Sequence, residues 1–173
     1  MENGQPHVNY QGFIKFVIDR LEHDRAMRAR LRQADNPNME YQSWEYLARF
    51  GVNLQNRRKC KAFATVAAAL ARADLKADGT LGIGCAIAQS YRDGKDDDQA
   101  KARLRRLLAC KTSEEVCDVL RPLLRLVDSR GQPVGFEKLL RDILFFDSYP
   151  EDTRARWAQD FFNTRSEDDT EEE

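Results

Sequence analysis

Arginine recurs at helical spacing in four parts of the chain. Arg25, Arg28 and Arg32 lie three and four residues apart, and Arg121 and Arg125 repeat the four-residue interval. This spacing places side chains on one face of a helix. The two other clusters are Arg58, Lys61 and Arg72, and Lys101, Arg103, Arg105 and Arg106. A stripe of cations neutralises phosphates and releases their counterions, so these faces could bind nucleic acid without reading its sequence.

The alternative for each cluster is an ordinary solvated helix face whose cations pair with nearby acids. The overall charge helps to decide between the two. The net charge of −1 depends on residues 167–173 (EDDTEEE), and without their six carboxylates 23 acids remain against 28 bases. Four basic clusters on an arginine-rich body of that charge favour a nucleic-acid partner, because arginine stays charged and its planar fork fits phosphate.

The chain offers no arrangement typical of catalysis. It contains no activated-serine or HExxH motif, and His7 and His23 are isolated from each other and from every cysteine. Residues 79–84 (GTLGIG) lack the pattern of a phosphate-binding loop and are better explained as a helix start with close packing. Asp96, Asp97 and Asp98 are consecutive and are better explained as helix caps than as metal ligands. We therefore expect no enzyme activity, no metal and no cofactor.

The four cysteines indicate a reducing compartment. None forms a CxxC pair, and each lies in an apolar helical pattern, so we interpret them as free thiols, mostly in the core: Cys60, Cys85, Cys110 and Cys117. The N-terminal residues are polar, and the most apolar stretch, residues 63–71, is too short to span a bilayer. We expect a cytoplasmic protein without a membrane partner.

Hydrophobic residues recur with a period of 3.6, which predicts an all-α fold of about eight helices. Pro122 predicts a kink or early break in the sixth helix. We expect the aromatic residues near the C-terminus to be core: Phe145, Phe146, Trp157, Phe161 and Phe162. The predicted helices cover residues 10–33, 40–50, 57–74, 81–91 and 136–146. A fifth helix, capped by one of the aspartates at 96–98, ends near Cys110, a sixth is capped by Thr112 or Ser113 and ends near Val127, and a last one starts near Pro150.

The polar, charged segment 92–98 (RDGKDDD) is the best internal boundary in the sequence. Four helices precede it and four follow, which predicts two small helical bundles in tandem, over residues 1–94 and 95–164. The acidic residues that follow, 165–173, carry no apolar pattern and are predicted to form a disordered tail.

Four stretches together resemble the CasB-type small subunit of the type I-E CRISPR complex called Cascade. Residues 28–34 (RARLRQA) resemble the arginine-rich end of the first helix of that family, and residues 79–82 (GTLG) resemble its G-x-SLG segment. Residues 103–108 (RLRRLL) resemble its RFRRLL motif, with leucine in place of phenylalanine. Residues 136–143 (FEKLLRDI) and 156–162 (RWAQDFF) resemble its C-terminal end, although Gln159 replaces an arginine and Phe146 stands where tryptophan is common.

The resemblance implies a non-catalytic subunit that is present in two copies and lies beside the backbone subunits. Its partners would be the guide RNA and target DNA backbone, the other Cascade subunits, and a second copy of itself as a homodimer. Base pairing carries specificity in such complexes, while protein contacts go mostly to the backbone. We expect phosphate contacts that stabilise the R-loop in antiviral defence from Arg28, Arg32, Arg103 and Arg106, which lie in matching motifs. We expect the same from Arg58 and Arg121 on helical position alone. The alternatives are a helical adaptor that binds only protein and, less well supported, a helix-turn-helix regulator.

Overall fold

The computed structural model describes residues 9–165, and over this range the chain is all helical, as the sequence predicts. The only extended pairing in this range is an isolated bridge between Leu81 and Val134. The α-helices are α1 (Tyr10–His23), α2 (Arg25–Gln33), α3 (Trp44–Arg49), α4 (Arg57–Ala73), α5 (Ile83–Gln89), α6 (Asp98–Leu108), α7 (Ser113–Ser129), α8 (Phe136–Phe145) and α9 (Pro150–Phe162). Two short 3-10 helices, η1 (Pro37–Ser43) and η2 (Gly94–Asp96), precede α3 and α6.

The prediction of one helix over residues 10–33 is wrong, because the chain turns between α1 and α2 at Asp24. The backbone of Asp24 is extended, with φ of −122°, and its carboxylate accepts a hydrogen bond of 2.8 Å from the backbone N–H of Met27. Aspartate is a favoured N-cap because its side chain satisfies a free N–H group in the first turn. Asp24 therefore begins a second helix where the hydrophobic period alone continues.

Most of the other predicted helix ends agree with the structure. Gly51 follows α3 with φ of +94°, a left-handed conformation that glycine adopts without strain. One of the three aspartates caps α6 as expected, and the structure shows that it is Asp97, while of Thr112 and Ser113 it is Thr112 that caps α7. Of the two outcomes predicted at Pro122, the early break is wrong, because α7 continues through this residue to Ser129, and the kink stays a prediction. The predicted helix over residues 40–50 begins as η1 and becomes α-helical only at Trp44.

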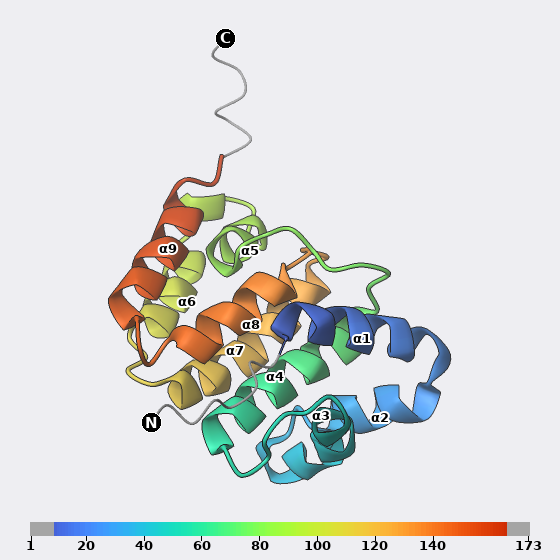
Figure 1. Ribbon diagram of the computed structural model, residues 1–173. Coiled ribbons are helices and arrows are strands. Elements are labelled where there is room, and N and C mark those ends of the chain that lie inside the picture. Colours follow the sequence, from blue (N-terminus) through green and yellow to red (C-terminus); the bar gives the residue numbers. More distant parts are fainter. Residues whose placement is uncertain (1–8, 166–173) are drawn as a thin grey trace.

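The long helix α4 lies in the middle of the fold, as Figure 1 shows, and packs against α2, α7 and α8. It is buried along most of its length, from Cys60 to Ala71, which explains why its sequence is rich in alanine. The buried hydrophobic residues form one cluster that extends from Phe13 in α1 to Phe161 in α9. The predicted division at residue 95 stays a prediction, and helices from the two sides of it share this core.

A second group of helices, α5, α6 and α9, lies together at one side of the molecule (Figure 1). The approach of α5 to α9 depends on Gly84, because a Cβ atom there would lie 2.1 Å from the backbone oxygen of Trp157. Gly82 is the N-cap residue of α5. The glycines of residues 79–84 therefore serve a helix start and close packing, as predicted.

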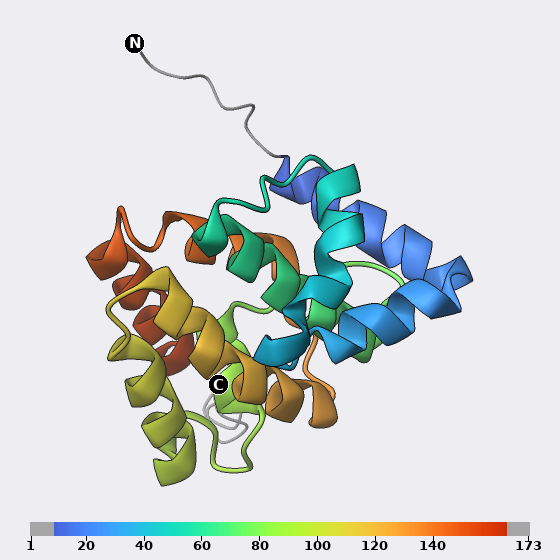
Figure 2. The same cartoon turned by 90° about the horizontal axis from the view of Figure 1, so that it is seen from below.

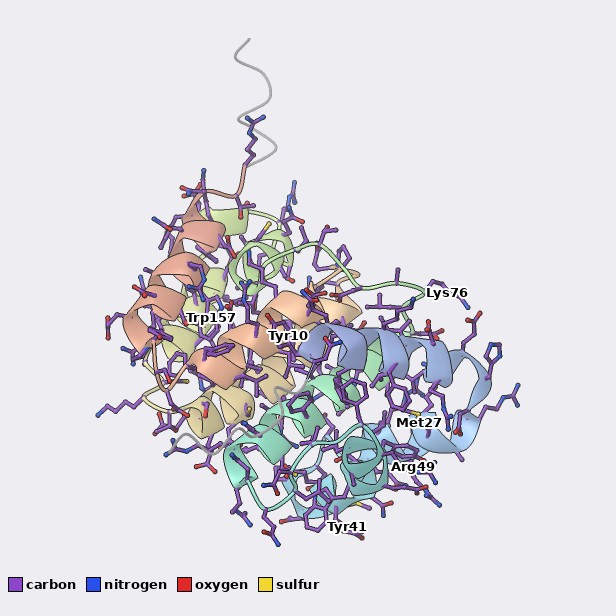
Figure 3. All side chains as sticks on the ribbon, in the orientation of Figure 1. Tyr10, Met27, Tyr41, Arg49, Lys76 and Trp157 are labelled. Carbon is purple, nitrogen blue, oxygen red and sulfur yellow. The ribbon has the colours of Figure 1, made fainter. Side chains whose placement is uncertain are left out.

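The C-terminal aromatic residues divide into a buried and an exposed set. Trp157, labelled in Figure 3, is 1% exposed and stacks on buried Phe146 at a centroid distance of 5.8 Å, and Phe161 is also buried. The prediction is wrong for Phe145 and Phe162, whose side chains are 44% and 51% exposed. The predicted acidic tail lies outside the described residues, apart from Arg165.

Candidate nucleic-acid interface

Arg28 and Arg32 use their guanidinium groups to hold the end of α4. Both donate hydrogen bonds of 3.0 Å to the backbone oxygen of Ala71, from Nη1 of Arg28 and Nε of Arg32. Arg28 also binds the backbone oxygen of Leu21 and forms a 2.9 Å ion pair with Asp74. The last carbonyl groups of a helix lack partners within that helix, so these arginines satisfy α4 and join it to α2. Their main contacts are within the protein.

Arg121 lies in the interior, which corrects its expected place on an accessible face. It is 3% exposed, and Nη1 donates to the backbone oxygens of Ala34 at 3.0 Å and Asp35 at 2.6 Å. Its Nη2 forms a 3.0 Å ion pair with Glu40. A buried cation needs such partners to offset its lost hydration. Arg121 fastens the segment before α3 onto α7 and has no access to a phosphate in this fold.

Arg58 is the second residue of α4 and stays accessible, with 62% of its side chain exposed. Its Nη1 lies 3.5 Å from Oδ2 of Asp147, a carboxylate that also accepts hydrogen bonds from the backbone N–H and hydroxyl of Ser113. This long contact leaves most of the Arg58 guanidinium facing solvent. Arg58 is therefore available to an external anion, unlike Arg28 and Arg121.

The helix α6 carries the largest group of cations that the fold does not use. Lys101, Arg103, Arg105 and Arg106 make no ion pair or side-chain hydrogen bond with any other residue of the range 9–165. Arg105 and Arg106 are exposed, while Lys101 and Arg103 are partly buried. In Figure 2 this helix forms an outer edge of the molecule. Both Arg103 and Arg106, predicted from sequence, thus belong to an accessible basic surface.

The position of these cations follows from the residues between them. Leu104 and Leu107 are buried at 1% and 0% exposure and fix one side of α6 against the core. Asp97 caps the start of the helix, where its carboxylate accepts hydrogen bonds from the backbone of residues 99 and 100. Negative charge at a helix start and positive charge near its end both stabilise the helix dipole. Four cations on the remaining turns then concentrate positive potential on one short element.

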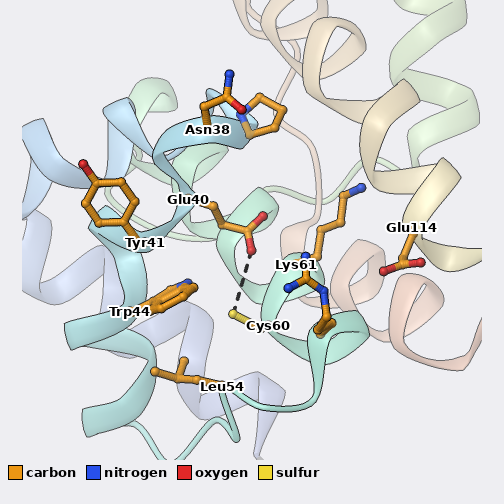
Figure 4. Close-up of a pocket in the computed structure, with 10 residues that line it drawn as sticks. Asn38, Glu40, Tyr41, Trp44, Leu54, Cys60, Lys61 and Glu114 are labelled. Carbon is orange, nitrogen blue, oxygen red and sulfur yellow. Dashed lines mark hydrogen bonds between the residues drawn. The ribbon is translucent and has the colours of Figure 1, made fainter.

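Sequence reasoning missed a cleft beside η1 and α3, shown in Figure 4. Its volume is about 340 Å³, and two exposed aromatic side chains, Tyr41 and Trp44, form part of its wall. Cys60 contacts Glu40 there, with Sγ 3.9 Å from Oε1. Burial, and next the negative charge of Glu40, raise the pKa of the Cys60 thiol to about 11. That thiol is protonated at neutral pH and has little nucleophilic character.

The cysteines match the prediction of free thiols that lie mostly in the core. All four are unpaired, and Cys60, Cys110 and Cys117 are buried, whereas Cys85 is intermediate. Among the described residues, no three His, Cys, Asp or Glu side chains are grouped so that they could hold a metal ion. None of the helices between residues 9 and 165 has the length and apolar character needed to cross a membrane.

The fold of this chain is similar to that of proteins whose structures have been solved. The chain is similar to a protein solved as "CRISPR RNA-guided surveillance complex", with 23% identity, a TM-score of 0.69 and coverage of 89% of this chain and 91% of the other. It is also similar to CasB of M. ruber, with 21% identity, a TM-score of 0.68 and coverage of 89% and 92%. At these identities the two likenesses show a shared fold. No curated protein sequence matches the chain.

The family model of the CRISPR-associated protein Cse2 matches residues 27–162, which is most of the chain. This range includes the four stretches that carry the resemblance to CasB-type small subunits, together with α6 and its cations. The resemblance inferred from the sequence is confirmed, and the chain belongs to the CRISPR-associated protein Cse2 family.

Proposed function

We propose that this chain is a non-catalytic small subunit of an RNA-guided CRISPR surveillance complex of the Cascade type. In this proposal α6 contacts the phosphate backbone of the guide RNA and target DNA and stabilises the R-loop. One observation carries the proposal: Lys101, Arg103, Arg105 and Arg106 are free of ionic partners within residues 9–165. Many arginines elsewhere are tied to carboxylates or backbone oxygens, so the cations of α6 stand out as available.

The chemistry of α6 suits a backbone contact better than base reading. Arginine and lysine bind phosphate oxygens through charge and hydrogen bonds, and such contacts hold a nucleic acid in place without selecting its sequence. In an RNA-guided complex, sequence is read by base pairing, so a helper subunit needs only this kind of contact. Exposed Arg58 adds a candidate phosphate contact at the start of α4. We also propose that the protein is cytoplasmic. Its partners in this proposal are other Cascade subunits and a second copy of the chain.

The test is the double charge reversal Arg103→Glu with Arg106→Glu. Both side chains lie off the buried Leu104–Leu107 face of α6, so circular dichroism should match that of the native chain. The matched control is Arg20→Glu with Lys76→Glu, the same charge change at two exposed positions. Figure 3 shows Lys76 at the side of the molecule opposite Trp157, away from α6. Retention of opened target DNA by the assembled complex should fall for the first variant only.

The salt dependence provides a second measure of the same contact. Binding to duplex DNA should weaken linearly in a plot of log affinity against log salt, with a slope of about −0.9 per phosphate contacted. Loss of two contacts should make the slope of the Arg103/Arg106 variant shallower by about two units. Normal target binding by a folded, assembled variant would refute the proposed role of α6.

A protein-only adaptor is the second candidate, and the exposed aromatic residues favour it. Phe145, Tyr149 and Phe162 are 44%, 59% and 51% exposed, and aromatic side chains are enriched at protein interfaces. If this candidate is correct, the Arg103/Arg106 variant either behaves normally or fails to assemble with partner subunits while it remains folded. Loss of assembly would place α6 at a protein interface instead of a nucleic-acid one.

A further inference from the structure

The cleft beside η1 and α3 presents flat aromatic surface to solvent. Tyr41 is 54% exposed and Trp44 is 43% exposed, although both are large side chains that could have been buried. They lie three residues apart, and Figure 4 shows both at the same side of the cleft. A volume of about 340 Å³ lies at the lower end of the range of about 300–1,000 Å³ that is usual for small-ligand pockets. The cleft is large enough for a single planar group.

The polar groups around the cleft differ in whether the fold already uses them. Glu40 is held by Arg121 and contacts Cys60, and Lys61 forms a 2.7 Å ion pair with Asp118. Arg57, at the first position of α4, is exposed and makes no ion pair with any residue of the range 9–165. The side-chain amide of Asn38 also lines the cleft and offers both a donor and an acceptor. The carboxylate of Glu114 lines the cleft too, is partly buried and makes no ion pair within residues 9–165. The cleft thus combines stacking surface, one free guanidinium, one amide and one carboxylate.

The cleft is connected to the basic residues of the proposed interface through short contacts. Arg58 follows Arg57 directly and contacts Asp147, which in turn binds Ser113 at the start of α7. Glu114, the next residue of α7, lines the cleft, and only four residues separate α7 from the end of α6. Arg58 is thus adjacent to a residue that lines the cleft, which allows one extended strand to contact both.

We infer that this cleft holds one unpaired nucleobase of a single-stranded nucleic acid, stacked on Trp44 with the adjoining phosphate at Arg57. The inference rests on the proposed function, because a base reaches the cleft only if the chain binds nucleic acid. Aromatic side chains that stack bases beside a basic track are the common feature of sequence-independent single-strand binding. An aliphatic side chain from a partner protein would pack on the aromatic surface but would bring no anion to the Arg57 guanidinium. A nucleotide supplies both a flat base and a phosphate, and we therefore favour it.

The two tryptophans of the chain make the inference measurable in the intact protein. Trp157 is 1% exposed, stacks on Phe146 and donates a hydrogen bond to Asp142, so it should not respond to a ligand. Trp44 is accessible, and base stacking should quench its fluorescence. The probe is a short single-stranded DNA, compared with an abasic strand that carries the same number of phosphates. The normal strand should quench Trp44, whereas the abasic strand should bind more weakly and leave the fluorescence unchanged.

Variants separate stacking from other effects, with affinity measured by fluorescence anisotropy of a labelled strand. Trp44→Ala should weaken binding of the normal strand roughly 5- to 140-fold, the range expected for one stacked base, and should not affect the abasic strand. Trp44→Phe keeps an aromatic ring and should stay within a few-fold of the native chain. Tyr149→Ala is the matched control, because it removes an aromatic side chain that is 59% exposed elsewhere. Circular dichroism should be the same for all three variants.

Three results would overturn the inference, and they differ in what they imply for the proposed function. Equal binding of the normal and abasic strands without quenching would reject the base site and leave the phosphate contacts of α6 intact. Absence of binding by either strand would reject the proposed function as well. Normal strand binding by Trp44→Ala, together with lost assembly of partner subunits, would assign the cleft to a protein.

Discussion

Replacing Arg121 with alanine should cost the fold much of its stability, although the residue was predicted to serve nucleic-acid binding. The substitution leaves Glu40 without its buried ionic partner and the backbone oxygens of Ala34 and Asp35 without a donor. Removal of one partner of a buried ion pair costs about 3–5 kcal/mol, because the other charge stays desolvated. We expect the Arg121→Ala variant to lose about 3–5 kcal/mol of unfolding free energy, a large share of the roughly 5–15 kcal/mol that is typical of a protein.

The assay is urea unfolding followed by circular dichroism at neutral pH. The matched control is Arg125→Ala, one helical turn further along α7, where the side chain is 52% exposed and forms a 3.1 Å ion pair with Asp35. The Arg125 side chain is half exposed, and Asp35, although buried, keeps its 2.7 Å ion pair with Arg72, so this control should lose much less unfolding free energy than Arg121→Ala. If the two variants lose similar amounts of unfolding free energy, burial of the arginine does not determine the cost of removing it, and the reasoning is refuted.

The remaining predictions concern alkaline pH and the acidic tail. Burial raises the pKa of the Cys60 and Cys117 thiols from 9.0 to about 11 and about 12. The folded state therefore holds these protons more tightly than the unfolded state. The contribution of the two protonated thiols to the unfolding free energy is complete below pH 9 and is lost as the pH rises toward 12. Urea unfolding at increasing pH should show the decline, and Cys117→Ala should make it shallower; a flat profile would contradict the assignment. Deletion of residues 167–173, which carry six carboxylates and no apolar residue, should leave the melting temperature unchanged and tighten nucleic-acid binding. A large drop in melting temperature would show that these residues pack.

The helical fold could be predicted because hydrophobic spacing and capping residues agree over most of the chain. The aspartates at 96–98 and the pair Thr112 and Ser113 indicate helix starts in the sequence, and Asp97 and Thr112 are the caps in the structure. The break at Asp24 was missed because apolar residues continue at helical spacing on both sides of it. The same aspartate was a visible signal, since its side chain competes for a backbone N–H as a helix cap does. Pro122 does not end α7, because packing against the neighbouring helices outweighs the local preference of proline.

The candidate site was only partly predictable, because spacing places residues on a helix face but does not say what that face meets. Arg103 and Arg106 remain accessible, whereas Arg121, at similar helical spacing from its neighbours, is buried against residues 34, 35 and 40. The partners of Arg121 lie more than 80 positions earlier in the sequence, beyond the reach of any local pattern. The cleft was missed for the same reason, since η1, α4 and α7 meet only in the folded chain.

The contact between α5 and α9 can form only after a delay during protein synthesis. Residues 83–89 emerge from the ribosome before the helix that covers them, and 60 residues, 90–149, separate the two elements. At about 5–20 residues per second, the start of α9 follows about 3–12 s later. Until then α5 lacks the partner for its apolar side, which includes Ile83, Ala86 and Ile87. The last helix to be made therefore completes one of the closest contacts in the molecule, at Gly84, and a ribosome that stalls before residue 150 leaves this contact unmade.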